Sequence, residues 1–509
     1  MAHWAKSPLD RRQQVLFAPT LDQTVSADHP VRLLAETLDR LDFSEWESMY
    51  VRVVGQPPIH PRVLAGCLIY GLSLGIRSRR RLEDAAGNRL DFIWLLNGCV
   101  PDHATLCKFR ISFGPQIKSL FRQVGRVAMA MGLIALNQGM LDGTDVKSNN
   151  SRHSTHRHAS LQRKQEALDR QIETLLAETE AQDQDQADDA WLGEATPTKL
   201  PKPLRDLTQR QERLGRAMEA LKELEKTPRP GKNQGPSIPT TDPDSRVLSC
   251  KQGGYAPGYT VVAATDAEHG LIVDVDVIAG NDEAGTVLPA VERIENFFDR
   301  KPSEMVADSG FNTGANLAEL AERGIEPLMP ARQSLDASSV QREDPTRPVA
   351  ESERAKLPMS PQNKKLDRSA FLYDRRNDRY HCPMGRPLPL TEHRTYNRPG
   401  QKGIYNVYES LDCGGCPLAS QCLIGRSPRR RLCRDEYEEL REAMARRINS
   451  EEGRRYKRRA PVAERPFAVF KSLMNFRQFL VRGMKKVKIE LDWVATTFNV
   501  MALIRATAP

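Results

Sequence analysis

The stretch of sequence that decides the fold runs from Tyr259 to Ile278 and reads YTVVAATDAEHGLIVDVDVI. Two runs rich in Val, Ile, Thr and Ala flank the polar segment Asp266–Gly270, a pattern typical of a β-hairpin. A short strand at Met140–Thr144 precedes the hairpin, and four elements follow it. These are a helix over Glu283–Phe298, a strand at Val306, a helix over Thr313–Arg323 and a strand over Ile325–Met329. The order βββ-α-β-α-β predicts an α/β fold in which helices cover a mixed sheet.

The charge of the chain points to a polyanionic partner. Its 509 residues are enough for several domains, and 75 Lys and Arg face 66 Asp and Glu, a formal net charge of +9. The excess is concentrated in Arg426–Arg434 and Arg446–Lys488, whereas Glu178–Glu194 is acidic. We favour nucleic acid as the partner over the alternative of a merely well-solvated basic surface.

The sequence carries no signal for secretion or membrane insertion. Met1–Lys6 lacks the apolar segment of a signal peptide, and the longest apolar run, Val63–Ile76, is too short to span a bilayer. We therefore expect a cytoplasmic protein with no membrane partner. In that reducing compartment the nine cysteines argue against a disulfide framework.

Composition divides the chain into six segments. Residues 1–133 are expected to be helical, with helices after Pro30 and Pro61, over Arg81–Ala86 and from a capped start at Pro101–Thr105. The other segments are 134–158, a first core strand and loop; 159–244, a helical hairpin or coiled coil followed by a mobile linker; 245–330, the sheet core; 331–435, a linker and a cysteine-rich insertion; and 436–509, C-terminal helices.

Surface arginines make the N-terminal helices a candidate DNA-binding module. We expect Arg77, Arg79 and Arg110 to lie on helix surfaces and to contact DNA. The alternative is a helical domain whose arginines are simply solvated.

Two aspartates are candidates for one metal site. Asp142 ends the apolar pair Met140-Leu141, as at the mouth of a strand, and we prefer it to Asp145, which the alternation of side chains puts on the opposite face. Asp308 follows a buried strand, at the edge of the sheet where ligand sites gather. Taken singly, Asp142 is better explained as an ordinary turn residue, and Asp308 equally well as a helix N-cap or turn residue.

A third carboxylate, Glu464, opens a basic C-terminal stretch. Glu464 precedes Lys471 by seven residues, two helical turns, so both side chains would share one helix face. Pro466 is expected to keep Glu464 in the first turn, where the helix dipole favours a carboxylate and Lys471 can reach a phosphate. The alternative is a solvated Glu and Lys on a surface helix. Three carboxylates can hold two hard cations, which stabilise the attacking and leaving oxygens when a phosphodiester bond is cut or joined.

Four cysteines late in the chain have the spacing of zinc ligands. Cys413 and Cys416 form a knuckle pair, and two further thiols complete a tetrahedral set. The set is Cys382, Cys413, Cys416 and Cys422, with Cys433 or His381 as a substitute. We expect a structural Zn²⁺ rather than free thiols in a loop-rich insertion.

The three acidic segments, their order, the helical insertion and the C-terminal tail resemble the DDE transposases of bacterial insertion sequences. The resemblance covers nearly the whole chain. Gly55–Arg110 resembles the helical domain of one such group, the cysteine pattern resembles the insertion that precedes its Glu, and Arg482–Asn499 resembles its tail. It implies an α/β fold with an RNase H-like mixed-sheet catalytic core in 134–158 and 245–330, an α-helical N-terminal DNA-binding domain, a helical insertion, a small zinc-ribbon-like insertion and C-terminal catalytic helices.

The resemblance also implies roles for individual residues. Asp142, Asp308 and Glu464 would be the triad that holds Mg²⁺ or Mn²⁺, with Lys471 beside them. Related transposases carry a Tyr, an Arg and a Lys around the Glu. The matching residues are Tyr456, Arg459 and Lys471, with Arg459 one position farther from Glu464 than the usual pattern. Ala460-Pro461 indicates that Tyr456 and Arg459 belong to the helix before that of Glu464.

The function implied is that of an insertion-sequence transposase. It would bind terminal inverted repeats in double-stranded DNA, cut at the element ends and join the 3′-hydroxyls to target DNA in the nucleoid, as a homodimer or higher oligomer. The rival functions are a metal-dependent nuclease or resolvase on the same fold, and an inactive relative retained for DNA binding. The presence of all four residues, Asp142, Asp308, Glu464 and Lys471, weighs against the inactive relative.

Overall fold

The computed structural model describes residues 20–50, 57–187, 202–226, 235–249, 254–330, 344–360, 363–398, 401–425, 427–448, 450–453, 456 and 459–507. The chain divides into two compact units. The helical unit comprises Met1–Ala130, Ala468–Arg477 and Lys488–Pro509, and the sheet unit comprises Met131–Phe467 and Gln478–Val487.

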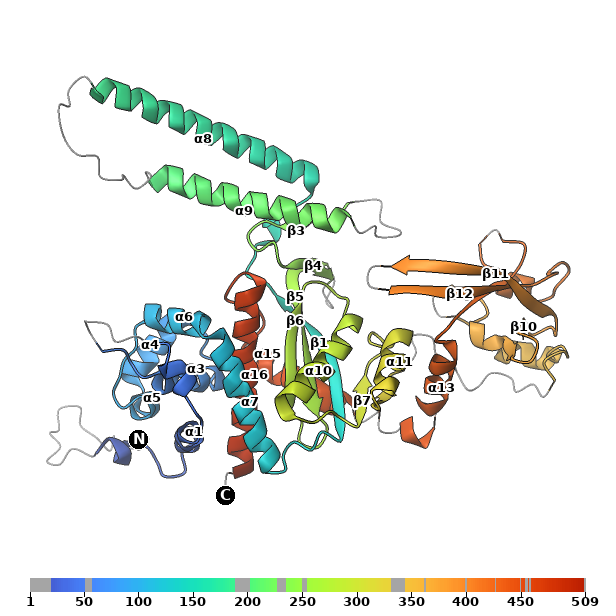
Figure 1. The fold of residues 1–509 in the computed structure, drawn as a ribbon, viewed down its shortest axis with the longest axis horizontal. Helices are drawn as coiled ribbons and strands as arrows, with labels where there is room; N and C mark the ends of the chain where they lie inside the picture. The colour runs from blue at the N-terminus through green and yellow to red at the C-terminus, as the bar shows by residue number, and fades with distance from the viewer. Residues whose placement is uncertain are drawn as a thin grey trace, which may run out of the picture. The chain divides into compact units, whose positions relative to one another are not determined.

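The helical unit packs short helices around one long buried helix (Figure 1). The short helices are α1 (Pro30–Asp39), α2 (Ser44–Glu47), α3 (Pro61–Ser73), α4 (Arg79–Asn88), α5 (Leu90–Leu95), α6 (His103–Ser112) and α7 (Gly114–Ala130), and the long one is α16 (Met484–Thr507). Every residue from Ile489 to Val500 is buried. The hydroxyls of Thr496 and Thr497 donate to the carbonyls of their own helix four residues back, which satisfies polar groups that burial would otherwise penalise.

The helices expected in this unit are confirmed. The His29 ring accepts from Val31 N–H, the His60 ring accepts from Arg62 N–H, and the Asp102 carboxylate accepts from two backbone N–H groups of α6. The helix predicted over Arg81–Ala86 is α4, which extends two residues farther at each end.

The sheet unit is built on a mixed sheet of six strands (Figure 1). They are β1 (Gln138–Lys147), β4 (Arg246–Ser249), β5 (Tyr255–Asp266), β6 (Ile272–Ile278), β7 (Glu304–Ala307) and β8 (Glu326–Leu328). β5 pairs antiparallel with β1, β4 and β6, whereas β1 pairs parallel with β7, and β7 with β8. β5 is buried from Ala256 to Asp266, and neighbouring strands pair its backbone on both edges. The crossover helices are α10 (Val287–Phe298) and α11 (Gly314–Glu322), so the predicted mixed sheet with helices is confirmed.

A helical hairpin is inserted between β1 and β5. Its helices α8 (His158–Ala187) and α9 (Lys202–Glu225) lie side by side, and the short strands β2 (Thr155–His156) and β3 (Ile238–Pro239) pair at its base. Leucines at a spacing of seven, including Leu161, Leu168, Leu214 and Leu221, form its buried core. The predicted helical hairpin is confirmed.

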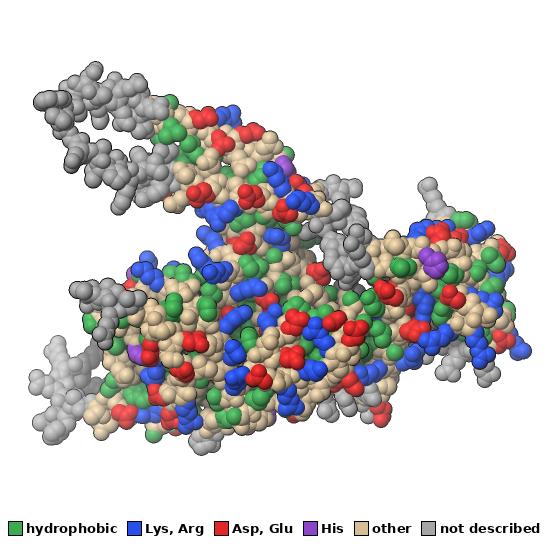
Figure 2. All heavy atoms as spheres, viewed as in Figure 1, with side chains coloured by type: hydrophobic (Ala, Val, Ile, Leu, Met, Phe, Trp, Pro, Cys, Tyr) green, Lys and Arg blue, Asp and Glu red, His purple; other side chains and the backbone are tan. Residues whose placement is uncertain are grey.

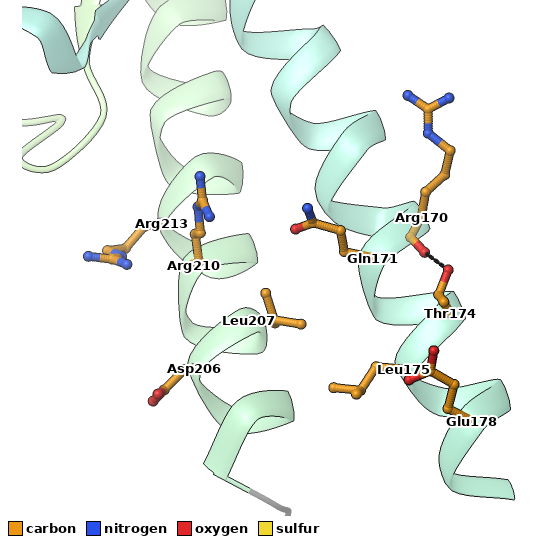
Figure 3. A pocket seen from close by; sticks show the side chains of 9 residues that line it. All are labelled: Arg170, Gln171, Thr174, Leu175, Glu178, Asp206, Leu207, Arg210 and Arg213. Carbon is orange, nitrogen blue, oxygen red and sulfur yellow. Dashed lines mark hydrogen bonds between the residues drawn. The ribbon is translucent and has the colours of Figure 1, made fainter.

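The hairpin also contains an open groove of about 740 Å³ between α8 and α9. Figure 3 shows Gln171, Leu175 and Leu207 pointing into this space, while Asp206 and Arg213 point away from it. Acidic and basic side chains are interspersed over the hairpin (Figure 2). The groove therefore has an apolar floor and rims of mixed charge, without a converging set of catalytic groups.

The linker expected to be mobile is held in place in its described part. Thr240 N donates to the Ser154 carbonyl at 2.8 Å, and Asp242 is only 1% exposed. The Asp242 carboxylate accepts hydrogen bonds from the Tyr259 hydroxyl at 2.8 Å and from Gly483 N–H at 3.0 Å. The expectation of mobility is wrong for residues 238–245, because this segment packs beneath the turn that leads into α16.

The cysteine-rich insertion contains a second sheet that the sequence analysis did not predict. Five antiparallel strands lie in the order β13-β12-β11-β10-β9. They are β9 (Leu372–Asp374), β10 (Arg379–His381), β11 (Pro387–Arg398), β12 (Gln401–Glu409) and β13 (Arg431–Asp435). Tyr380, Leu388 and Tyr408 lie in its core, and the short helix α12 (Ala419–Cys422) packs there through Cys422. Helix α13 (Glu438–Ile448) follows.

Candidate active site

Asp142 and Asp308 occupy equivalent positions on two adjacent parallel strands. Leu141 of β1 is paired with Ala307 of β7, and each aspartate is the next residue of its chain segment. Asp308 lies directly after β7, as predicted, and its carboxylate accepts a 2.7 Å hydrogen bond from Gly310 N–H. Asp142, in contrast, is the fifth residue of a strand that continues to Lys147, so the prediction of a strand end there is wrong. The strand also rules out the alternative of a turn at Asp142.

The two faces of β1 distinguish Asp142 from Asp145. Asp145 is exposed and accepts a 3.0 Å hydrogen bond from the Thr260 hydroxyl. Asp142 shares the opposite face with Met140 and Val146, because side chains alternate along a strand. Tyr259, the partner of Val146, packs edge-on against Phe479 with ring centres 5.6 Å apart.

Helix α15 (Arg459–Ser472) carries Glu464. Met140 and Val462 line one cavity of about 690 Å³, and Arg465 Nη1 donates to the His269 carbonyl at 3.3 Å. The start of α15 therefore lies near the first residues of β1 and the turn between β5 and β6.

The β-ladder along the Asp142 edge of β1 is interrupted among the residues that the structure describes. β7 pairs with β1 as far as Leu141 and Ala307, and the described pairing resumes at the bridge between Lys147 and Gln478. Phe479 N–H donates to the Lys147 carbonyl at 2.9 Å, which fixes the far end of this interval.

Glu464 lies deeper in its helix than predicted. It is the sixth residue of α15, not a first-turn residue, and it is exposed. The helix continues through Pro466, and Lys471 follows two turns later in the same helix, as predicted. Arg459 begins α15, so the expectation that Arg459 belongs to the preceding helix is wrong, because Pro461 is accommodated in the first turn. Tyr456 lies just before α15 and is half-buried.

Two transposase families match the sequence. The family model described as "Transposase DDE domain" matches residues 381–504, which include Glu464 and Lys471, and the one described as "Transposase domain (DUF772)" matches residues 19–112. The matches identify a transposase with a DDE domain and an N-terminal transposase domain. No curated protein matches it.

The DDE domain confirms the predicted class of enzyme and of partner. DDE transposases cut DNA and transfer its strands, and they generally use divalent metal ions. DNA is accordingly the partner of this transposase. Within the described ranges, no helix is long and apolar enough to cross a membrane.

The arginines expected on the N-terminal surface of the transposase occupy two environments. Arg77 donates from Nη2 to Glu490 Oε1 at 2.9 Å and from Nη1 to the Asn475 carbonyl at 2.9 Å, and its guanidinium lies over the Phe476 ring. Arg110 lies 3.9 Å from the same Glu490 carboxylate, and both arginine side chains are about nine-tenths buried. The expectation that these two lie on the surface is therefore wrong, because α16 supplies a buried carboxylate for both.

Arg79 is the exposed member of the three predicted DNA contacts. It begins α4, next to Arg80 and Arg81, which are exposed as well. This short basic turn presents three neighbouring guanidinium groups on the surface of the helical unit.

The four cysteines expected to bind zinc line one small cavity of the transposase, of about 20 Å³. Gly385 N–H donates to the Cys382 carbonyl at 2.8 Å, and Cys416 N–H to the Cys413 carbonyl at 3.4 Å, so Cys382 begins one tight turn and Cys413 and Cys416 flank another. Burial raises the pKa of the Cys422 thiol to about 11, and the other three thiols add to the rise. The two possible substitutes differ from this set, since Cys433 is exposed on β13 and His381 lies 3.8 Å from Asp374.

Neither predicted metal site shows closed ligand geometry. Across the residues that the structure describes, no group of three or more His, Cys, Asp or Glu side chains is arranged to hold a metal ion. The structure brings Asp142 and Asp308 together by strand register and carries Glu464 on α15, without closing the three carboxylates into a cage.

Sequence reasoning missed Glu283, which the structure places beside Asp308 and against Gly143, the residue after Asp142. The Glu283 carboxylate carbon lies 2.7 Å from the position that a Cβ of Gly143 would occupy. The available signal was the glycine itself, because a glycine inside a strand often marks the close approach of another group. Gly143 has no positive φ that would otherwise explain it.

Proposed function

We propose that this transposase mobilises an insertion sequence. It binds the terminal inverted repeats of the element, cuts the DNA at its ends and joins the 3′-hydroxyls to target DNA. The observation that carries the proposal is the register of β1 and β7, which sets Asp142 and Asp308 side by side in a chain that matches a DDE transposase domain.

The strand order supports an RNase H-like catalytic core. Three antiparallel strands, β6, β5 and β1, continue into the parallel strands β7 and β8, with a helix before β7 and another before β8. Ligand sites in sheets with parallel strands gather at the carboxyl ends of the strands, which is where Asp308 lies. The proposed catalytic core comprises 134–158, 245–330 and the helices of 436–509.

The donors at this edge of β1 fit a hard divalent cation. Asp142 and Asp308 offer only carboxylate oxygens, the ligands that Mg²⁺ and Mn²⁺ prefer, and two adjacent carboxylates repel each other without a cation. Asp142, Asp308 and Glu464 are the residues that would hold the metal. When bound, the metal stabilises negative charge on the attacking and leaving oxygens of the phosphodiester.

Basic groups along α15 and α4 have the positions for phosphate contacts. Lys471 lies two turns after Glu464, so it can contact a phosphate alongside the carboxylates. We assign Tyr456 and Arg459 to the DNA strand beside Glu464, and Arg79 to the DNA bound by the helical unit. Arg77 and Arg110 would act only indirectly, through the packing of α16.

The four thiols fit a structural Zn²⁺. Zinc prefers a tetrahedral set of thiolates, and two tight turns in a small sheet domain are the usual frame for such a site. Cys382, Cys413, Cys416 and Cys422 would cross-link β10, the segment before α12 and α12 itself. Metal analysis of the purified transposase should give one zinc per chain, and a Cys413→Ser variant should have lost it. Wild-type protein without stoichiometric zinc would remove this assignment.

Two element ends must meet before they are joined to one target. We therefore propose a homodimer or higher oligomer on DNA, acting in the bacterial nucleoid.

The decisive experiment uses DNA that carries the repeat flanking the gene, with Mg²⁺ and purified transposase. Cleavage followed by joining to a target plasmid is the expected result. Cleavage alone would indicate a nuclease or resolvase, and binding alone an inactive relative. Asp142→Asn, Asp308→Asn and Glu464→Gln should each abolish cleavage and keep DNA binding, whereas Asp145→Asn should keep both.

A further inference from the structure

Two glycines leave room for carboxylates beside β1. A Cβ on Gly143 would meet the Glu283 carboxylate, with Cδ at 2.7 Å and Oε2 at 3.0 Å. A Cβ on Gly310 would lie 2.9 Å from Asp308 Oδ1 and 3.9 Å from Glu283 Oε2. Neither glycine has a positive φ, so backbone conformation does not require glycine at these positions. Glycine fits there because a side chain would collide with a carboxylate. The carboxylates of Asp308 and Glu283 thus approach the same point from two segments of the chain.

Buried hydrogen bonds hold the two segments together. Asn316 of α11 is only 6% exposed, and its side-chain amide donates to the Ala284 carbonyl and to the Phe311 carbonyl, both at 2.9 Å. Ala284 follows Glu283, and Phe311 ends the turn that begins at Asp308. The Glu283 carbonyl itself accepts from Thr286 N–H and from the Thr286 hydroxyl. The position of Glu283 next to Asp308 is therefore built into the fold.

We infer that Glu283 is a fourth carboxylate of the metal site, which contributes an oxygen ligand toward the cation held by Asp308. This inference rests on the proposed function, because it takes Asp308 as a metal ligand. Glu283 reaches Asp308 from the segment between β6 and α10, on the face of β1 toward which a Gly143 side chain would point. Hard divalent cations bind through several carboxylate oxygens, and a flexible Glu side chain can adjust its reach to the cation.

The test is Mn²⁺ binding to the full-length, metal-free transposase without DNA, measured by isothermal titration calorimetry. Glu283→Gln should weaken Mn²⁺ binding about tenfold or more, the usual effect of removing a group that supports a metal site. Glu295→Gln is the matched control, because it removes the same charge from an exposed position of α10 and should bind as wild type.

A second variant keeps every carboxylate and changes only the space. Gly143→Ala places a methyl group where the Glu283 carboxylate lies, and the flexible end of that side chain can move away without backbone strain. Gly143→Ala should also weaken Mn²⁺ binding. This variant keeps the test decisive if Glu283→Gln does not fold. If Glu283→Gln or Gly143→Ala binds Mn²⁺ as tightly as wild type while Asp308→Asn binds it more weakly, the inference about Glu283 is wrong and the proposed metal site stands. Wild-type affinity in Asp308→Asn would remove the proposed metal site, and the inference with it.

Discussion

Replacing Asp142 by Asn should stabilise the metal-free transposase and remove its stabilisation by metal. Asp142 and Asp308 follow paired residues of adjacent parallel strands, and adjacent strands lie about 4.8 Å apart. Two carboxylates about 5 Å apart repel each other by roughly 0.8 kcal/mol at the dielectric constant of water and roughly 3 kcal/mol at the value typical of a protein surface. Because both residues are only half-buried, we expect a gain of about 1 kcal/mol in the free energy of unfolding.

The assay is urea unfolding in the presence of a chelator and again in millimolar Mg²⁺. Mg²⁺ should raise the free energy of unfolding of wild type. In chelator, Asp142→Asn should have a higher free energy of unfolding than wild type, and Mg²⁺ should raise it little further. Asp145→Asn is the control, because it removes the same charge from the other face of β1 and should respond to Mg²⁺ as wild type does. The reasoning is refuted if Asp142→Asn is less stable than wild type in chelator, or if Mg²⁺ stabilises it as much as wild type.

Further predictions concern stability elsewhere in the transposase. Glu490→Gln should lower the free energy of unfolding by about 3–5 kcal/mol in urea, because Arg77 would keep a buried charge without its carboxylate; an effect below about 1 kcal/mol would contradict the buried pair. Hydrogen bonds from the Thr105 hydroxyl and from the N–H groups of Thr105 and Ala104 lower the pKa of Asp102 to about 2. Because the pKa of Asp102 is lower in the folded than in the unfolded protein, this stabilisation is present above about pH 4 and is lost as the pH falls toward 2. The melting temperature of Asp102→Asn should therefore fall less than that of wild type over this pH range. Cys413→Ser should lower the melting temperature and abolish its sensitivity to a zinc chelator, and a wild type insensitive to chelator would speak against the zinc site.

Local sequence patterns predicted the elements of the core because those elements follow from local chemistry. The hairpin over Tyr259–Ile278, the two crossover helices and the strand before Asp308 are marked by alternation, helical spacing and turn residues. The same patterns misplaced Asp142, because Asp-Gly is a turn signal and here the strand runs straight through it. The Glu283 carboxylate, which lies where a Gly143 side chain would be, accounts for the glycine.

What the sequence could not reveal depends on partners distant in the chain. Arg77 and Arg110 are charged residues that the sequence predicts at the surface. They are buried because the Glu490 carboxylate, some 400 residues away in the chain, pairs with both. Glu283 is an ordinary acidic residue before a helix until Gly143 and Gly310 are seen to make room for it. The sheet of the cysteine-rich insertion has a local sequence signal, since β-forming residues flank Pro399-Gly400, whereas the cysteine spacing indicates a metal site and not strands.

The central claim is that Asp142 and Asp308 hold the catalytic metal of this transposase. The most direct measurement is DNA cleavage and joining by Asp142→Cys and Asp308→Cys, each assayed in Mg²⁺ and in Mn²⁺. A thiolate is a poor ligand for Mg²⁺ and a better one for Mn²⁺, so both variants should be inactive in Mg²⁺ and regain activity in Mn²⁺. Wild-type activity of either variant in Mg²⁺ would contradict the account.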